Sequence, residues 1–573
     1  MPANARPMTF ETVLEDIYGT GLFSILLTVI TSVTSFSSSF EIQSTIYMYY
    51  KPPFKCASIP GQLDSSSVVW IPRTIYDYII GNGSTLYSFT SKSNTVVEQC
   101  YGLAADTKTG TITPFQCNHF AFDQSVMNRT VITQLDLVCD NSKWIRRFES
   151  AYLFCNGIGY LVAMVCDFTG RRGPFICFAS LEIVCTLLTP FVPSVPFLFV
   201  LRCCRGFAAA LQCFAINLIL ELVPMRLRAV YGSVYWIPRA IGYMCAAGLA
   251  YVLRDWKMIK LWACVYFVVY LTYPLLVYES PRWLVLHGQG KKAINIVRKI
   301  AKWNKVSITQ EYIDQMDEYF AREYSMYLQS KMRPTTGNQP DFHTLRSIWP
   351  IYRSQRVSAC LSFCQKAWNR TTVLVVVQFA IATVYYGLIA DSTLASDNIF
   401  LNVLFLGLIE LPTSFVSLGL SGYFGRRLST SILLVLAGFS VFGTRLAVEF
   451  FPLALTGVAI TGKFLFTVAY YVTCVYAAEL HPTTLRSLGF FSVMASATVS
   501  SAFAPFNYRR RFLSSYYYFI SCGLASIVAG LIVYAFLPET KGCPLAQTVA
   551  ESEKFVRGRE EEWAREMEQS RVV

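Results

Sequence analysis

The sequence predicts an all-α membrane protein built from two pseudo-symmetric bundles of six transmembrane helices. The first observation is composition, because 54% of the 573 residues are hydrophobic, 15% are charged and the mean hydropathy is +0.41. A chain this apolar is not an ordinary soluble domain. The second observation is an internal repeat, in which Glu221–Arg228 and Glu479–Arg486 share the pattern E-L-x-P-x-x-L-R. Duplicated halves in a membrane protein are typical of transporters.

Two further matches extend the repeat at a nearly constant offset. Gly170–Arg172 corresponds to Gly425–Arg427, and Glu279 corresponds to Glu539. Matches in the same order and register indicate that the whole half is duplicated, since one short match alone can arise by chance.

Twelve apolar stretches account for the predicted helices in order. Crossing the hydrocarbon core takes about 20 mostly apolar residues, and backbone groups there must be satisfied within the helix. The first half contains six such stretches, near 21–44, 148–166, 173–191, 195–219, 231–253 and 259–278. The second half contains six more, near 371–390, 398–420, 428–448, 452–477, 487–507 and 513–536. We therefore expect a first bundle over 21–278 and a second over 371–536.

Basic residues between these stretches predict the topology. Much of the net charge of +13 lies in short loops, at residues such as Arg171, Arg226 and Arg426. This is the positive-inside pattern, and it does not indicate nucleic-acid binding. It places the N-terminal segment (1–20) and the tail (537–573) in the cytosol of a multi-pass protein, which we expect in the plasma membrane.

Residues 45–147 are predicted to form a large extracellular loop after the first helix. The loop carries four cysteines and two glycosylation sequons, as expected in an oxidising compartment: Cys56, Cys100, Cys117, Cys139, Asn82 and Asn128. We expect two disulfides. Three pairings of four cysteines are possible, and free thiols are the alternative. Cysteines elsewhere lack the paired spacing of a metal site, so we expect no metal.

Residues 279–370 are predicted to form a cytosolic loop between the two bundles. Within it, Ile294, Val297 and Ile300 share one face of an amphipathic helix over 291–300. The basic side of this helix either meets anionic lipid headgroups or is solvated in a helix that tethers the two halves.

Several motifs in the expected order span nearly the whole chain: Thr9–Leu14, Asp136–Asp140 with Trp144, Asp167–Arg172, Glu279–Leu284, Gly462–Phe464, Ala478–Pro482 and Leu537–Gly542. Together with the long loop after the first helix, they resemble the organic cation, organic anion and carnitine transporters of the major facilitator superfamily. The resemblance implies the major facilitator fold and a polyspecific carrier of small organic ions that works by alternating access.

The chain departs from this family at four places. Neutral Thr498 stands where family cation carriers have an acid and anion carriers have a basic residue. Gln378 replaces a tryptophan, Gly422 replaces the acid of the second Asp-x-x-Gly-Arg-Arg motif, and the loop has four cysteines where six are often seen. These departures leave the sign of the substrate charge open.

Charged residues at the predicted cytosolic ends recur in both halves and predict a gate. Arginine–carboxylate pairs there would hold the ends together when the carrier faces outward and would separate when it faces inward. The predicted gate residues are Asp167, Arg171, Arg172, Glu221, Glu279, Arg426, Arg427, Glu479 and Glu539. We expect the second half to be held less firmly, because Gly422 lacks the carboxylate of Asp167. The alternative is that the arginines only set the topology.

The substrate is expected near the membrane midplane between the halves, where ionisable residues are costly. The predicted substrate-binding residues are Phe36, Tyr235, Gln378, Tyr385, Tyr386, Glu410, Lys463 and Thr498. Aromatic rings attract organic cations and also stack on flat anions. Glu410 favours a cation and Lys463 favours an anion, and the alternative is that the two form a buried pair with no ligand. Arg202 and Arg205 share a helix face and must have partners.

The predicted function is transport of small organic cations or zwitterions by alternating access. The alternatives are an organic anion exchanger of the same fold and a receptor-like protein that binds ligand through its extracellular loop. We expect no enzyme and no cofactor, because the sequence has no Walker-type loop, no H-E-x-x-H pair and no G-x-S-x-G elbow. The expected partners are a small organic ion and the lipid bilayer, without nucleic acid. No oligomeric state is predicted.

Overall fold

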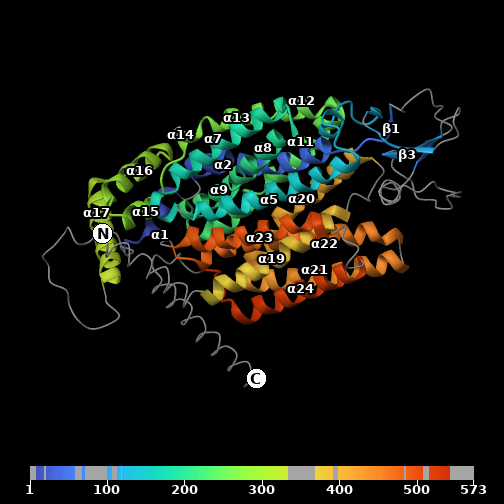
Figure 1. The fold of residues 1–573 in the computed structure, drawn as a ribbon. Coiled ribbons are helices and arrows are strands. Elements are labelled where there is room, and N and C mark those ends of the chain that lie inside the picture. The colour runs from blue at the N-terminus through green and yellow to red at the C-terminus, as the bar shows by residue number, and fades with distance from the viewer. Residues whose placement is uncertain are drawn as a thin grey trace, which may run out of the picture.

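The computed structural model describes residues 8–18, 21–57, 68–70, 100–105, 112–117, 119–164, 166–332, 368–391, 398–450, 452–482, 485–507 and 515–542. Long helices run roughly side by side along one direction, and those of the first half lie beside those of the second half (Figure 1). Short strands lie at one end of these helices, which we call the β end. The helices α15, α16 and α17 lie at the other end, which we call the α16 end (Figure 1).

The first half is composed of several long helices and some shorter pieces. They are α2 (Leu22–Met48), α5 (Lys143–Ala163), α6 (Cys166–Thr169), α7 (Arg172–Leu188), η4 (Thr189–Phe191), α8 (Val195–Ala208), α9 (Leu211–Leu222), η5 (Met225–Leu227), α10 (Arg228–Val234), α11 (Ile237–Leu253), α12 (Trp256–Leu261), α13 (Cys264–Tyr270) and α14 (Tyr273–Leu276). The predicted stretches 195–219, 231–253 and 259–278 are thus each divided. Pro238 and Pro274 lie in the first turns of α11 and α14, where the ring takes the place of an N–H that a continuous helix would use.

The described residues of the second half form six long helices: α19 (Trp368–Asp391), α20 (Ile399–Tyr423), α21 (Gly425–Phe450), α22 (Pro452–Leu480), α23 (Arg486–Asn507) and α24 (Ser515–Phe536). Each predicted stretch of both halves falls on helix. Within the described residues, nine helical stretches are long and apolar enough to cross a membrane, and two shorter apolar helices cover Arg370–Tyr385 and Ile520–Phe536. The count of twelve spans stays a prediction.

Two helix pairs form much of the contact between the halves. α5 packs against α23, and α11 packs against α20. The two pairs are equivalent, because α5 is the counterpart of α20 and α11 is the counterpart of α23 in the repeat. The interface between the halves therefore has the pseudo-symmetry of the sequence.

The β end holds two small antiparallel sheets. β1 (Phe54–Cys56) pairs with β5 (Phe120–Phe122), and β3 (Tyr101–Ala105) lies between β2 (Val68–Trp70) and β4 (Ile112–Gln116). The short helices α4 (Val131–Gln134) and η3 (Cys139–Ser142) lead from this region into α5. Disulfides join Cys56 to Cys117 and Cys100 to Cys139. Asn128 is exposed, whereas Asn82 lies outside the described residues.

The α16 end carries more helix than the single amphipathic segment predicted from the sequence. α15 (Pro281–Leu286), α16 (Gly290–Trp303) and α17 (Gln310–Met332) follow one another, and the N-terminal pieces α1 (Phe10–Val13) and η1 (Leu14–Tyr18) pack near them. Ile294, Val297 and Ile300 of α16 are buried, so the predicted apolar face is in contact with protein. Phe10 of α1 stacks on Phe320 of α17 at 5.9 Å between ring centres.

The cysteine pairing gives a first testable prediction. Mass spectrometry of peptides released without reduction should find Cys56 linked to Cys117 and Cys100 linked to Cys139. The change Cys56→Ser should free the Cys117 thiol for alkylation while the Cys100–Cys139 peptide persists, and loss of one bridge should lower stability by about 2–5 kcal/mol. A peptide that joins Cys56 to Cys100 would contradict the structure.

Candidate functional site

A cavity lies at the centre of the helices, between the two halves. Four helices of each half line it, namely α2, α5, α9 and α11 and then α19, α20, α22 and α23. The cavity volume is about 70 Å³, several times the roughly 10–15 Å³ that one water needs. Its lining residues are Ser38, Ile42, Tyr152, Leu153, Asn156, Tyr160, Gln212, Arg239, Ile381, Ala382, Tyr385, Glu410, Thr467, Tyr470, Tyr471, Met494, Ala497, Thr498 and Ser501.

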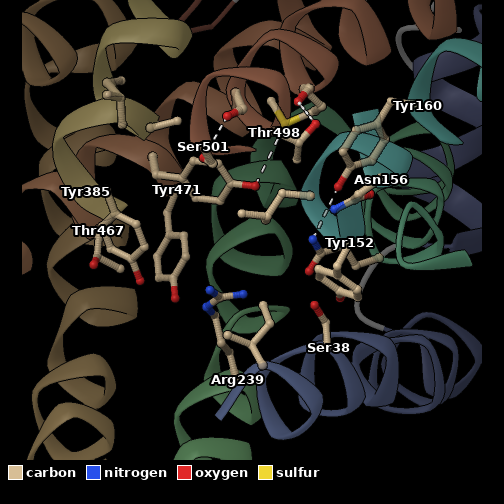
Figure 2. Close-up of a pocket in the computed structure, with 18 of the residues that line it drawn as sticks. Ser38, Tyr152, Asn156, Tyr160, Arg239, Tyr385, Thr467, Tyr471, Thr498 and Ser501 are labelled. Carbon is tan, nitrogen blue, oxygen red and sulfur yellow. Dashed lines mark hydrogen bonds between the residues drawn. The ribbon is translucent and has the colours of Figure 1, made fainter. Parts of the chain in front are cut away.

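Tyrosines and one guanidinium dominate the lining. Figure 2 shows Tyr385 and Tyr471 on one side, Tyr152 and Tyr160 on the other, and Arg239 between them. Tyr471 stacks on Trp236 at 4.7 Å between ring centres, so its ring is held by the first half while its helix belongs to the second. The cavity therefore offers ring faces and polar tips on both sides of a central charge.

The carboxylate of Glu410 is shared by two cations. Its Oε1 lies 3.2 Å from Nε of Arg239, and its Oε2 lies 3.4 Å from Nζ of Lys463. The Tyr471 hydroxyl donates a hydrogen bond of 2.9 Å to Oε1. All of these side chains are buried. Because Arg239 is on α11 and Glu410 is on α20, this ion pair joins the two halves in the middle of the molecule.

The structure brings together only some of the residues predicted to bind substrate. Tyr385, Glu410 and Thr498 line the cavity. Lys463 lies outside the lining. It contacts Glu410, which is the contact expected if the two residues form a buried pair. For Tyr386, the side chain lies outside the described part of the structure.

Three other predicted residues lie outside the cavity lining. Phe36 packs against Phe40 and Tyr266 within the first half. The Tyr235 hydroxyl donates to the backbone oxygen of Gln212 at 2.6 Å, and Gln378 is fully buried in α19. Phe36 and Gln378 lie in helices as predicted, whereas Tyr235 lies in the turn between α10 and α11. The sequence did not give the rotation of each helix about its axis.

Sequence reasoning missed most of the lining. The missed polar residues are Ser38, Tyr152, Asn156, Tyr160, Gln212, Arg239, Thr467, Tyr470, Tyr471 and Ser501. One available signal was spacing, since Tyr152, Asn156 and Tyr160 recur every four residues and so share a face of α5. Another was Arg239, a charge within an apolar helix that required a partner.

A repeated turn organises the α16 end of each half. Gly170 and Gly425 have positive φ of 92° and 83°. Glu279 accepts hydrogen bonds from the backbone N–H groups of Arg171 at 2.7 Å and Arg172 at 3.1 Å. A side chain at Gly170 would collide with this carboxylate, because an added Cβ would lie 2.4 Å from Oε2 of Glu279. Glycine is therefore required both for its backbone angle and for its lack of volume.

The second half repeats this turn with the equivalent residues. Glu539 accepts from the N–H groups of Arg426 at 2.9 Å and Arg427 at 3.1 Å. The adjoining ion pairs are also equivalent, since Arg171 lies 3.1 Å from Glu221 and Arg426 lies 3.0 Å from Glu479. Each of these contacts stays within one half, so they hold together the helices of a bundle.

Different contacts join the two halves at the α16 end. Asp167 accepts hydrogen bonds from the N–H groups of Ser487 at 3.3 Å and Leu488 at 2.9 Å, in the first turn of α23. A carboxylate at a helix N-terminus is favourable because it meets unpaired donors and the positive end of the helix dipole. Arg486 also lies 3.4 Å from Glu221 of the first half. The residues predicted to form a gate thus make contacts both within and between halves, and Arg486 was not among the predicted residues.

The pseudo-symmetric counterpart of these contacts would join Gly422 and Glu479 of the second half to the start of α10. The N-terminal helix α1 makes a contact there instead. Gly422 provides no carboxylate, and Arg228, the counterpart of Arg486, forms an ion pair with Glu11 of α1. Glu11 also lies 2.7 Å from Arg282. Burial by itself raises the pKa of Glu11, but the guanidiniums of Arg282 and Arg228 outweigh it and hold the pKa at about 2. Glu11 therefore stays ionised at physiological pH.

Aromatic residues join the halves toward the β end. Tyr47, at the end of α2, stacks on Phe400, at the start of α20, with 5.5 Å between ring centres. Tyr251 of α11 meets the same ring edge-on at 5.6 Å. Contacts between the halves therefore lie on both sides of the cavity.

A second buried charge network lies within the first half. Glu41 of α2 contacts Arg202 at 3.2 Å and Lys260 at 2.8 Å. Arg205 contacts Glu182 of α7 at 2.8 Å. These are the partners that Arg202 and Arg205 were expected to need, and they tie α2, α7, α8 and α12 together.

Comparisons with known proteins place these features in context. A family model described as "Sugar (and other) transporter" matches residues 76–550. Solute carrier family 22 member 20 of Mus musculus is 26% identical over 443 residues, covering 76% of this chain and 75% of the relative. The organic cation transporter-like protein of Drosophila melanogaster is 24% identical over 559 residues, covering 96% of this chain and 93% of the relative.

A solved structure shares the fold. The major facilitator superfamily proton:xylose symporter XylE, bound to 6-bromo-6-deoxy-D-glucose, superposes with a TM-score of 0.55 at 18% sequence identity. The match covers 73% of this chain and 90% of the symporter chain. The described helices thus have the major facilitator fold.

Replacing Glu11 tests whether the N-terminal helix holds the α16 end. Glu11→Gln removes the charge that Arg228 and Arg282 share, so two buried guanidiniums lose a partner, which we expect to cost about 1–3 kcal/mol. Limited proteolysis should then cleave near residues 8–18 at a protease concentration that leaves the parent protein intact. Glu311→Gln, at an exposed position of α17, is the control. Equal cleavage of both variants would contradict a holding role for Glu11.

Proposed function

Because the chain belongs to the sugar (and other) transporter family, we propose that it is a polyspecific transporter of small organic ions, cations or zwitterions, that works by alternating access. The observation that carries the proposal is the cavity, because it is lined by four helices of each half. Contacts between the halves lie on both sides of it. Such a site can be exposed to either side of a membrane by rocking one half against the other.

The composition of the cavity supports an organic ion as substrate. Tyrosine rings attract organic cations by their quadrupoles and stack on flat groups, while a few polar tips and charges orient the ligand. The lining has five tyrosines, at Tyr152, Tyr160, Tyr385, Tyr470 and Tyr471. Relatives named organic cation transporter protein and organic cation transporter-like protein, both of Drosophila melanogaster, agree with this substrate class.

The topology that we propose has twelve transmembrane helices, in bundles over 21–278 and 371–536, in the plasma membrane. The α16 end, with 279–370 and both termini, faces the cytosol, and the β end, within 45–147, faces outward. The two disulfides at the β end and the basic residues at the α16 end support this orientation.

In this topology the gate contacts control access from the cytosol. Two contacts would break as the carrier opens inward. One joins Asp167 to the backbone N–H groups in the first turn of α23, and the other joins Glu221 to Arg486. The turns built on Glu279 and Glu539 would move as rigid parts, because their contacts stay within one half. On the outer side, Tyr47 and Phe400 would separate instead.

Replacing Glu221 tests the gate. Glu221→Gln leaves Arg171 and Arg486 without the charge between them, so the closed cytosolic end is destabilised and the maximal uptake rate should fall by about tenfold or more. Uptake of a labelled organic ion and surface biotinylation should be measured together in the same cells. Glu318→Gln, exposed on α17, is the matched control. Unchanged uptake kinetics with normal surface expression would exclude the gate role of Glu221.

Replacing Tyr385 tests the cavity as the substrate site. Tyr385→Ala removes a ring that lines the cavity, and we expect the KM for an aromatic organic ion to rise by roughly 10-fold, since a lost aromatic contact costs about 1–2 kcal/mol. The control is Phe154→Ala on α5, whose ring is 50% exposed on the outside of the bundle. Purified protein in liposomes gives the kinetics. A KM that changes equally in both variants would place the substrate elsewhere.

A further inference from the structure

We propose that the substrates of this transporter carry a carboxylate or similar anionic group, and that this group binds the guanidinium of Arg239. The inference rests on the proposed transport of small organic ions and changes the preferred class of ion, from cations or zwitterions to zwitterions and anions.

The charges in the cavity do not balance. Among the described residues that line it, Arg239 is the basic one and Glu410 is the acidic one, and Lys463 lies 3.4 Å from the same Glu410 carboxylate. Two cations therefore share one anion, which leaves a net charge of +1 in a buried site. An uncompensated charge is costly away from water. An entering anionic group would cancel this charge, whereas a simple cation would add to it.

The guanidinium of Arg239 has donors available for such a group. Its side chain extends from α11 into the cavity (Figure 2), and the residue is only 9% exposed. Its hydrogen bond to a described residue uses Nε, which donates to Glu410. No hydrogen bond joins its two terminal nitrogens to any residue that the structure describes. A guanidinium binds a carboxylate through two parallel N–H donors, so one edge of Arg239 suits a second carboxylate.

If the ion pair between Glu410 and Arg239 breaks, Glu410 keeps its two other partners. The Lys463 ammonium lies beside its Oε2, and the Tyr471 hydroxyl donates to its Oε1 at 2.9 Å. When a substrate carboxylate takes Arg239, the site would hold two ion pairs, substrate with Arg239 and Glu410 with Lys463. For an anionic substrate, the exchange thus turns an unbalanced group of three charges into a balanced group of four, and the ammonium of a zwitterion would lie away from this group, against the tyrosine rings.

The same exchange links binding to movement. The ion pair between Arg239 on α11 and Glu410 on α20 joins the two halves. A substrate that replaces it connects the halves through its own body, with its anionic end on Arg239 and its remainder against tyrosines such as Tyr385 and Tyr470. A positively charged remainder would meet ring faces, and an uncharged aromatic remainder would stack on them.

Three compounds with the same phenyl group separate the substrate classes. They are 3-phenylpropionate, an anion, phenylalanine, a zwitterion, and 3-phenylpropylammonium, a cation. The full-length protein should be purified, reconstituted in liposomes and tested for saturable uptake of each. We expect one or both carboxylates to be taken up with at least a tenfold higher kcat/KM than the cation, and the better of the two identifies the anion or the zwitterion class. Cation uptake equal to or above both carboxylates would overturn the inference but leave organic ion transport standing. Absence of uptake of all three compounds and of a wider set of organic ions would instead contradict the proposed function.

Variants then test the role of Arg239 itself. Arg239→Gln should lower carboxylate kcat/KM at least tenfold and improve the cation relative to the carboxylates. Arg239→Lys keeps the charge but not the paired donors, so the carboxylate kcat/KM should fall by an intermediate amount. Because this variant retains a cationic partner for Glu410, it also serves as the test if Arg239→Gln does not fold. Lys463→Gln removes the excess charge while leaving Arg239, and it should shift selectivity toward the cation. Unchanged selectivity in folded Arg239→Lys and Lys463→Gln proteins would overturn the assignment.

Discussion

Compensation of buried charge is the constraint on which the arrangement of the two halves depends. A charge inside an apolar bundle is stable only with a partner, and the partner need not lie on the same helix or in the same half. Glu410 meets this requirement with Arg239 from the first half and Lys463 from the second. The ion pair thereby fixes how α11 faces α20 and positions the cavity beside it. The network of Glu41 with Arg202 and Lys260 does the same for helices within the first half.

The α16 end shows how a duplicated sequence supports both rigid and separable contacts. Glu279 and Glu539 bind the backbone at the start of α7 and α21, and the glycine before each turn leaves room for the carboxylate. These contacts repeat because they lie inside each copy. The contacts between copies do not repeat, since Asp167 meets α23 whereas Gly422 has no carboxylate to offer. Glu11 of the N-terminal helix satisfies Arg228 instead, so a segment outside the repeat restores the charge balance.

Pseudo-symmetry also explains the shape of the central site. The two halves pack through two equivalent pairs of helices, α5 with α23 and α11 with α20, and the lining draws on four helices from each half. The residues themselves are not equivalent: Arg239 comes from one half and Glu410 from the other. A symmetric frame with an asymmetric lining suits a carrier, because rocking requires similar halves while recognition of a small ion requires a particular set of side chains.

The sequence by itself determined the apolar helices, the repeat and the identity of the repeated charged turns. Hydropathy and short motifs are local properties, so twelve stretches could be placed and Glu221, Glu279, Glu479 and Glu539 could be selected from them. It also selected Tyr385 and Glu410. Only the tertiary structure decided the cysteine pairing, which of the predicted gate residues contact the other half, and that Glu11 pairs with Arg228. It also decided that Arg239 lies beside Glu410 and that Phe36 lies outside the cavity. These depend on how each helix is rotated about its axis and which helix lies opposite, and both follow from packing and charge compensation among residues that are far apart in the chain.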